Sequence, residues 1–301
     1  MILKVVAFLF LLLVTVSLSV YYFVPFSVTE FQAKSQNNNF SITGSENMQF
    51  YPNMRFPDTD ISYKINECPL QKKNDMEQAF KILEEKTSLR FYPLAGGEEI
   101  SVSCQSQNKF EGKLFIAGEG GPTNITQTKL FNVIFNGKVL LIKDSSCPTP
   151  NVAIHELFHV LGFEHSNNPN NIMYNISGCD QTIGNDIIEL INKLYVIPSN
   201  PDLGIINATA SIEGRYLNTE INVQNNGLKT SPATELLIYT DGSYLKKITV
   251  DSLDIGEGLR ITLQNVWVSK INVQKIKFVI NSSYEEISKQ DNEIILDVKS
   301  K

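Results

Sequence analysis

Residues 155–165 read HELFHVLGFEH and contain all three histidines of a chain of 301 residues. His155 and His159 are four residues apart, so on an α-helix both imidazoles leave the same face and can bind one ion. Gly162 follows the second histidine by three residues, where a helix that ends abruptly favours a residue able to adopt positive φ. The chain can then turn back and bring His165 to the same ion.

This spacing predicts a zinc site with His155, His159 and His165 as its protein ligands. Three ligands leave the fourth tetrahedral position open, which is typical of a catalytic rather than a structural zinc. Such a zinc makes hydroxide available near pH 7 and polarises a carbonyl group, and Glu156 is the expected general base. The alternative is an ordinary amphipathic helix with incidental histidines, which does not account for the accompanying glutamate and glycine.

At these residues the chain resembles the metzincin clan of zinc endopeptidases, and within it the matrixin-like members. The segment after His165 reads SNNPNNIMY at residues 166–174 and is similar to the segment in which the clan places a methionine turn beneath its metal. The resemblance implies that Met173 packs under the histidine rings and that Tyr174 lines the specificity pocket. Alone, a methionine would more often be a simple core residue.

The resemblance extends over about half of the chain and implies a catalytic domain at residues 51–198. Residues 185–195 look like the closing helix of the clan, and residues 54–57 and 61–65 resemble its first strand, followed by a helix over residues 72–88. The expected fold is α+β, with a mixed, mostly antiparallel-edged sheet over two or three helices and the zinc in a cleft.

A possible substrate strand lies at residues 113–118, which resemble the edge strand above the metzincin cleft. An extended peptide could add to such an edge as one more antiparallel strand. The residues that would bind substrate there are Phe115, Ile116, Ala117 and Gly118. The alternative is a strand whose glycine-rich end is only a loop.

Other features of matrixins are missing from the sequence. With all three histidines committed, the chain cannot build the histidine-held second zinc of many matrixins, and the cysteine-bearing propeptide motif of vertebrate members is absent. One zinc is therefore expected. No acidic loop has the spacing of calcium ligands, so calcium remains possible but unsupported.

Four cysteines, an even number, are compatible with two disulfides in an oxidising compartment. Sequence alone permits three connectivities. We favour Cys68–Cys104 and Cys147–Cys179. A Cys147–Cys179 bridge would tie the segment before the expected active helix to the segment after the expected methionine turn. Zinc ligation by cysteine is the rival interpretation, and no short Cys-x-x-Cys spacing supports it.

The first 26 residues form a separate apolar segment. Val5 to Val24 carry no charge, and roughly 20 such residues can cross a bilayer as a helix. We expect residues 1–26 to be an uncleaved signal anchor, with Lys4 on the inside and the remainder outside the cell. The alternatives are a cleaved signal peptide and a secreted protein. Residues 27–50 are polar and predict a mobile tether.

A second domain is expected at residues 199–301, after two prolines at 198 and 201. Short β-type runs separated by turn signals predict an antiparallel, immunoglobulin-like sandwich with Trp267 in its core. The segment resembles the CARDB family associated with prokaryotic surface proteins. Such a module would space the protease or contact substrate or envelope. The runs lie at residues 219–223, 236–239, 247–250, 260–263, 276–280 and 294–298.

Together these patterns predict a membrane-anchored, outward-facing zinc endopeptidase that acts on protein or peptide substrates. A net charge of −6 gives no basic footprint for nucleic acid. One rival is a cell-surface adhesion or binding protein with a vestigial or structural zinc site, although such a site would not need Glu156. Another is a hydrolase of cell-wall peptides.

Overall fold

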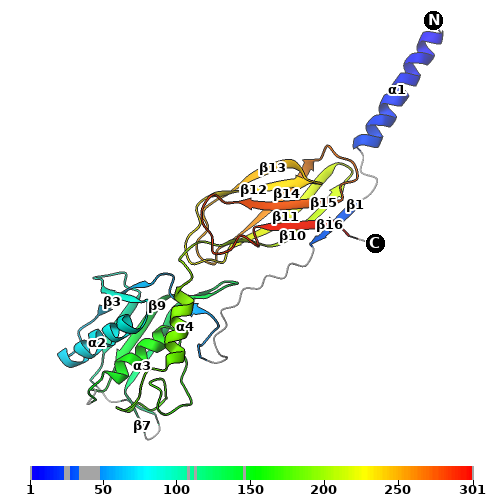
Figure 1. The fold of residues 1–301 in the computed structure, drawn as a ribbon. Helices are drawn as coiled ribbons and strands as arrows, with labels where there is room; N and C mark the ends of the chain where they lie inside the picture. Colours follow the sequence, from blue (N-terminus) through cyan, green and yellow to red (C-terminus); the bar gives the residue numbers. More distant parts are fainter. Residues whose placement is uncertain are drawn as a thin grey trace. The chain divides into compact units, whose positions relative to one another are not determined.

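The computed structural model describes residues 2–23, 28–33, 48–106, 109–111, 114–144 and 147–299. The chain divides into two compact units, which are described separately. The histidine unit consists of Asn39–Pro201 and Asn226–Lys229, and the sandwich unit of Met1–Asn38, Asp202–Asn225 and Thr230–Lys301. Figure 1 shows both units and the labels of their elements.

A six-stranded mixed sheet forms the framework of the histidine unit. Its strand order is β2-β9-β5-β3-β4, and β8 also pairs with β9. The β8–β9 pair is antiparallel and the other pairs are parallel, so the antiparallel character is confined to the β8 side. The strands are β2 (Met54–Arg55), β3 (Asp60–Ile65), β4 (Arg90–Pro93), β5 (Ile100–Cys104), β8 (Gly118–Gln127) and β9 (Asn132–Leu141), with a separate hairpin of β6 (Lys109–Glu111) and β7 (Leu114–Ile116).

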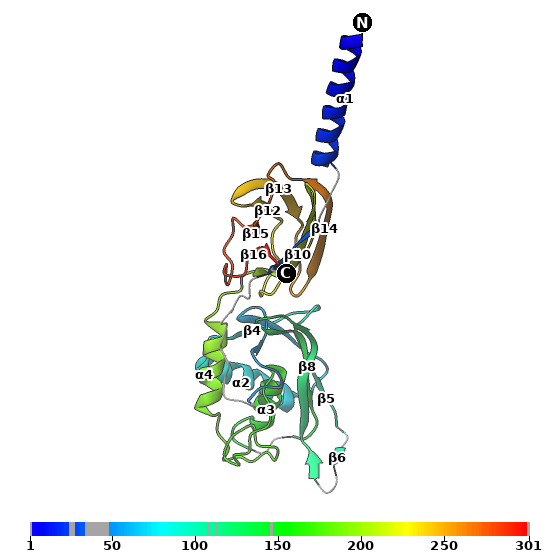
Figure 2. The ribbon, with the colours of Figure 1, turned by 90° about the vertical axis from the view of Figure 1, so that its right-hand side faces the viewer.

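Three helices accompany this sheet: α2 (Leu70–Lys86), α3 (Asn151–Val160) and α4 (Asn185–Tyr195). Figure 2 shows α2 and α3 on the same side of the sheet as α4. In α2 and α4 the buried apolar residues recur every three or four positions, as an amphipathic helix requires. They are Met76, Ala79, Phe80 and Leu83 in α2, and Ile187, Leu190, Ile191 and Leu194 in α4.

Two disulfides join segments of the histidine unit. Cys68 pairs with Cys104, which ends β5, and Cys147 pairs with Cys179. This is the connectivity that the positions of the cysteines in the sequence favour. The second bridge ties the residues before α3 to those that follow Met173.

One fully buried cation stabilises the C-terminal end of α4. Arg55 is 1% exposed, and its guanidinium donates to the carbonyl oxygens of Leu194 at 2.5 Å and Ile197 at 3.0 Å. It also donates to the carbonyl oxygens of the next two residues along the chain and lies 4.3 Å from the ring centroid of Tyr195. Burial lowers the pKa of the Arg55 guanidinium and raises the pKa of Tyr195 to about 12. The helix end therefore receives a positive charge where its dipole is negative.

The sandwich unit is an eight-stranded antiparallel sheet that surrounds one apolar core. All six runs predicted for this region lie inside observed strands. The order is β13-β12-β15-β16-β1-β10-β11-β14. The strands are β1 (Val28–Ala33), β10 (Leu203–Glu213), β11 (Tyr216–Asn225), β12 (Thr234–Thr240), β13 (Ser243–Val250), β14 (Gly258–Trp267), β15 (Lys275–Asn281) and β16 (Glu293–Val298). Trp267 was expected in the core but is 41% exposed at the end of β14.

Strand β1 differs from the polar tether expected at residues 27–50. It pairs with β10 on one side and with β16 on the other, and Phe31 belongs to the sandwich core. Residues 27 and 34–47 of the expected tether lie outside the described residues. Gln49 pairs with Phe163 of the histidine unit, so the segment just before residue 51 is also part of a unit.

The place of Phe31 leads to a stability prediction. Phe31→Ala should lower the free energy of unfolding of the sandwich unit by about 3–5 kcal/mol, because a buried aromatic ring leaves a cavity. The measurement is calorimetric unfolding of the full chain. The control is Gln32→Ala, on the exposed side of the same strand, which should change the transition little. Equal transitions for the two variants would contradict the role of β1 in the core.

The N-terminal residues form helix α1 (Ile2–Phe23), with apolar side chains exposed along it. Among the residues that the structure describes, no helix is sufficiently long and apolar to cross a membrane. The expected transmembrane anchor at residues 1–26 is therefore not supported.

Candidate metal centre and active site

The helix that carries the first two histidines ends in a Schellman motif. Gly162 has φ +92°, its N–H donates to the carbonyl oxygen of His159 at 2.9 Å, and the Phe163 N–H donates to that of Phe158 at 3.0 Å. Only a residue without a side chain adopts this φ cheaply, and a Cβ at residue 162 would lie 2.8 Å from the Cβ of Met54. The chain therefore reverses here and brings His165 back over α3.

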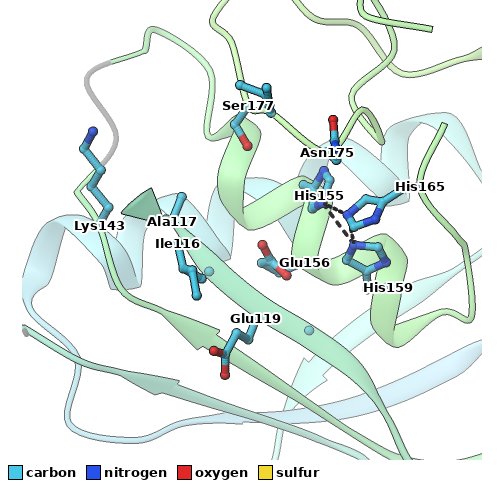
Figure 3. A pocket seen from close by; sticks show the side chains of 13 residues that line it. Ile116, Ala117, Glu119, Lys143, His155, Glu156, His159, His165, Asn175 and Ser177 are labelled. Carbon is cyan, nitrogen blue, oxygen red and sulfur yellow. Dashed lines mark hydrogen bonds between the residues drawn. The ribbon is translucent and has the colours of Figure 1, made fainter. Parts of the chain in front are cut away.

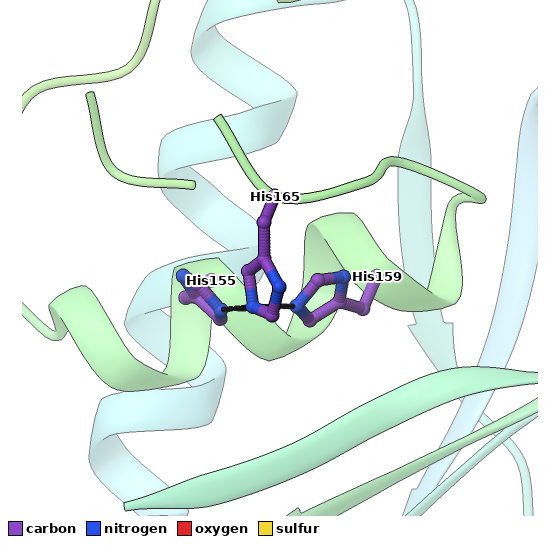
Figure 4. A group of neighbouring side chains, drawn as sticks. All are labelled: His155, His159 and His165. Atoms are coloured by element: carbon purple, nitrogen blue, oxygen red, sulfur yellow. Dashed lines mark hydrogen bonds between the residues drawn. The ribbon is translucent and has the colours of Figure 1, made fainter. Parts of the chain in front are cut away.

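Three imidazole nitrogens meet at one point (Figure 4). The Nε2 atom of His155 lies 3.0 Å from that of His159 and 3.3 Å from that of His165. The His159 and His165 Nε2 atoms are 3.1 Å apart. Nitrogen ligands at about 2.0–2.1 Å in a tetrahedral zinc site would be separated by about 3.3–3.4 Å. The observed donor set therefore fits one zinc ion.

The backbone fixes the tautomers of the two buried histidines. Nδ1 of His155 lies 2.7 Å from the carbonyl oxygen of Ile172, and Nδ1 of His159 lies 2.8 Å from that of Phe163. A carbonyl oxygen only accepts, so each Nδ1 carries the proton and donates. Each Nε2 then presents a lone pair to the common point, as metal ligation requires. Two facing lone pairs do not hydrogen-bond to each other, and a cation between them would remove their repulsion.

Burial also keeps these two rings neutral. It lowers the pKa of His155 and of His159 to about 4, and the neighbouring histidines act in the same direction. Both rings are therefore deprotonated at neutral pH in the metal-free protein. A metal ion does not have to displace a proton from either of them.

Glu156 lies between the histidines and the first residues of β8 (Figure 3). Its side chain is 5% exposed but lines a cavity of about 570 Å³ together with all three histidines. Burial raises the pKa of the Glu156 carboxyl to about 8, and the nearby Glu119 adds to the shift. A carboxyl group beside a cation-binding point and open to a cavity can exchange protons with a molecule bound there.

The strand side of this cavity includes three of the residues that the resemblance selects for substrate binding. Ile116, Ala117 and Gly118 line it, whereas Phe115 lies in β7 and its side chain lies outside the described residues. The backbone of this side is fixed, because the Ala117 carbonyl oxygen accepts from the N–H groups of both residues that follow β9.

The opposite wall departs from the resemblance. Tyr174 is half-buried and is not among the residues that line the cavity; Asn175, Ile176 and Ser177 form this wall instead. Met173 is buried, and its N–H donates to the Oδ1 of Asn171 at 2.8 Å. Met173 thus directly follows Ile172, whose carbonyl oxygen accepts the hydrogen bond from His155.

Sequence reasoning missed the wall residues 175–177, and also Glu119 and Lys143, which line the cavity. One feature of the sequence could have pointed to this wall: the favoured Cys147–Cys179 bridge ends two residues beyond it. Asn151, at the start of α3, holds the same segment by donating to the Gly178 carbonyl oxygen at 2.7 Å. In the described part of the chain, the histidines are the one group of three or more His, Cys, Asp or Glu with ligand atoms close enough to share an ion.

Comparisons with known proteins match two successive parts of the chain. The matrixin family model matches residues 55–196, and the CARDB family model matches residues 200–294. Macrophage metalloelastase of Rattus norvegicus is 30% identical over 167 residues, which are 48% of this chain and 34% of the relative. That of Oryctolagus cuniculus is 29% identical over 133 residues, 38% of this chain and 27% of the relative. The chain thus spans about a third of the length of these curated relatives or less.

Two solved structures resemble part of the chain. A domain of a protein described as a cell surface protein of Methanosarcina acetivorans is 15% identical, with a TM-score of 0.28, and covers 34% of this chain and 93% of its own. A CARDB domain of Pyrococcus furiosus, in complex with di-metal ions, is 20% identical, with a TM-score of 0.25, and covers 33% of this chain and 88% of its own. By the family matches, the chain carries a matrixin domain at residues 55–196 followed by a CARDB domain at residues 200–294.

Proposed function

We propose that the chain is a zinc-dependent endopeptidase that hydrolyses peptide bonds outside the cell. His155, His159 and His165 would hold one zinc ion, and Glu156 would be the general base. The observation that carries this proposal is the convergence of three Nε2 atoms within 3.3 Å of one another, beside a buried carboxyl group that lines the same cavity.

A zinc ion bound there would supply a Lewis acid that activates water and polarises the substrate carbonyl. Glu156 then takes a proton from the attacking water and delivers it to the departing amine. The Ile172 and Phe163 carbonyl oxygens keep the histidine rings oriented throughout. Met173 packs beneath the rings as an apolar floor.

The substrate is an extended protein or peptide segment. Among the described strands, β8 pairs with β9 alone, so its other edge is open to a further strand. The peptide would lie along residues 116–118, with its side chains toward the wall at residues 175–177. This assignment replaces Tyr174 as the main wall residue.

The two disulfides favour an oxidising compartment, and matrixin and CARDB domains suit the outside of the cell. The CARDB domain would position the catalytic domain or contact substrate or the envelope.

Removing the metal should abolish hydrolysis reversibly. The protein is expected to bind one zinc per chain and to cleave members of a degenerate peptide pool, read by mass spectrometry. A chelator should stop cleavage, and added zinc should restore it while both disulfides stay oxidised. Cleavage by the metal-free protein would exclude a zinc mechanism. Zinc binding without any cleavage would favour the binding protein with a structural metal.

A further inference from the structure

Two glycines of β8 lie against Glu156. They are Gly118 and Gly120, two residues apart and therefore on the same face of the strand. A Cβ at Gly118 would lie 2.7 Å from both the Cγ and the Oε1 of Glu156, and 2.9 Å from its Cδ. A Cβ at Gly120 would lie 2.3 Å from the main-chain oxygen of Glu156. Real Cβ atoms do not approach other atoms this closely, so neither position accepts a side chain without displacement.

The neighbouring strand β9 also packs closely against this face of α3. A Cβ at Gly137 of β9 would lie 2.4 Å from the Cγ1 of Val160. Val160 follows Glu156 by one turn of the helix, so both residues project toward the sheet. The histidines at residues 155 and 159 project from the adjacent face. The glycines therefore let α3 approach the sheet on its Glu156 side without touching the metal ligands.

The two glycines of β8 meet different parts of Glu156. The three atoms nearest to a Cβ at Gly118 belong to the Glu156 side chain, which can rotate away. The three atoms nearest to a Cβ at Gly120 belong to the backbone of the helix, which cannot. A methyl group at residue 118 would therefore displace the carboxylate and leave α3 in place. A methyl group at residue 120 would displace α3 itself.

We propose that Gly118 is a positioning residue for Glu156: the missing side chain at residue 118 defines the place of the carboxylate beside the histidines. Its consequence for catalysis rests on the proposed function. The packing itself does not, because it is a property of the metal-free protein.

A matched pair of variants tests this in the full chain. Gly118→Ala should lower kcat for peptide hydrolysis by about 100-fold, the effect of a misplacement on the order of 1 Å, while KM stays within about two-fold. Zinc content should remain one per chain. The control is Gly121→Ala, in the same strand, where a Cβ would meet nothing within 4 Å. It should retain the activity of the unmodified protein.

A second measurement needs neither metal nor activity. In the metal-free protein, Gly118→Ala should lower the melting temperature of the histidine unit by about 2–4 °C. The same substitution added to Glu156→Ala should lower it little further, because alanine at residue 156 lacks the three atoms that lie nearest to a Cβ at residue 118. This double-mutant cycle reports the contact directly.

The outcomes separate this proposal from the proposed function. If the unmodified protein cleaves no peptide, the endopeptidase assignment fails, and the melting cycle still tests the contact. Equal melting shifts with and without Glu156 would overturn the positioning role. So would an active Gly118→Ala variant, or one that loses activity only together with its zinc.

Discussion

Glu156→Gln is expected to lower kcat for peptide hydrolysis by about 10²–10⁴-fold, the usual contribution of a general base. The amide keeps nearly the shape of the carboxylate but cannot accept a proton from water at neutral pH. Zinc should remain at one ion per chain, because the three histidines and their carbonyl partners are unchanged. Steady-state kinetics and metal analysis of the same sample provide the measurement.

The matched control is Glu164→Gln, which makes the same chemical change at an exposed residue of the same stretch. Its activity should equal that of the unmodified protein. Zinc loss from Glu156→Gln would show that the carboxylate supports the metal rather than the reaction. Full activity would exclude Glu156 as the base.

Arg55→Met should lower the free energy of unfolding of the histidine unit by more than about 3 kcal/mol. The substitution leaves carbonyl oxygens at the end of α4 without their charged donor, and each buried charge-assisted bond contributes about 1.5–3 kcal/mol. The methionine fills most of the volume, so the loss reports hydrogen bonds rather than a cavity. Calorimetric unfolding of the full chain measures it.

Arg90→Met is the control for this prediction. Arg90 is exposed and also donates to carbonyl oxygens, those of Glu84 and Leu89. Because water can replace an exposed donor, this variant should lose less than about 1 kcal/mol. Similar losses in the two variants would contradict the importance of burial at Arg55.

Much of the site could be predicted because its information is local. The four-residue spacing of His155 and His159 needs only the geometry of one helix, and Gly162 marks where that helix ends. The bounds of α4 follow from one amphipathic stretch, and alternating patterns locate the six strands predicted in the sandwich.

The remainder depends on contacts between segments that are distant in the sequence. Nothing in residues 28–33 indicates that Phe31 enters a core built mostly from residues beyond 200. The wall at residues 175–177 faces the cavity because Asn151 and the Cys147–Cys179 bridge hold the segment there. The role of Gly118 appears only when β8 lies against α3. The pattern of residue types along the sequence does not show which distant segments come into contact.

The position of β1 has a consequence for biosynthesis. This strand leaves the ribosome before the rest of its sheet, while its two neighbours, β10 and β16, are both made after the whole matrixin domain. The matrixin domain is therefore an insertion within the CARDB-bearing unit. The sandwich unit can close only after β16 has been synthesised, and a fragment that starts at residue 200 would lack an inner strand of its sheet.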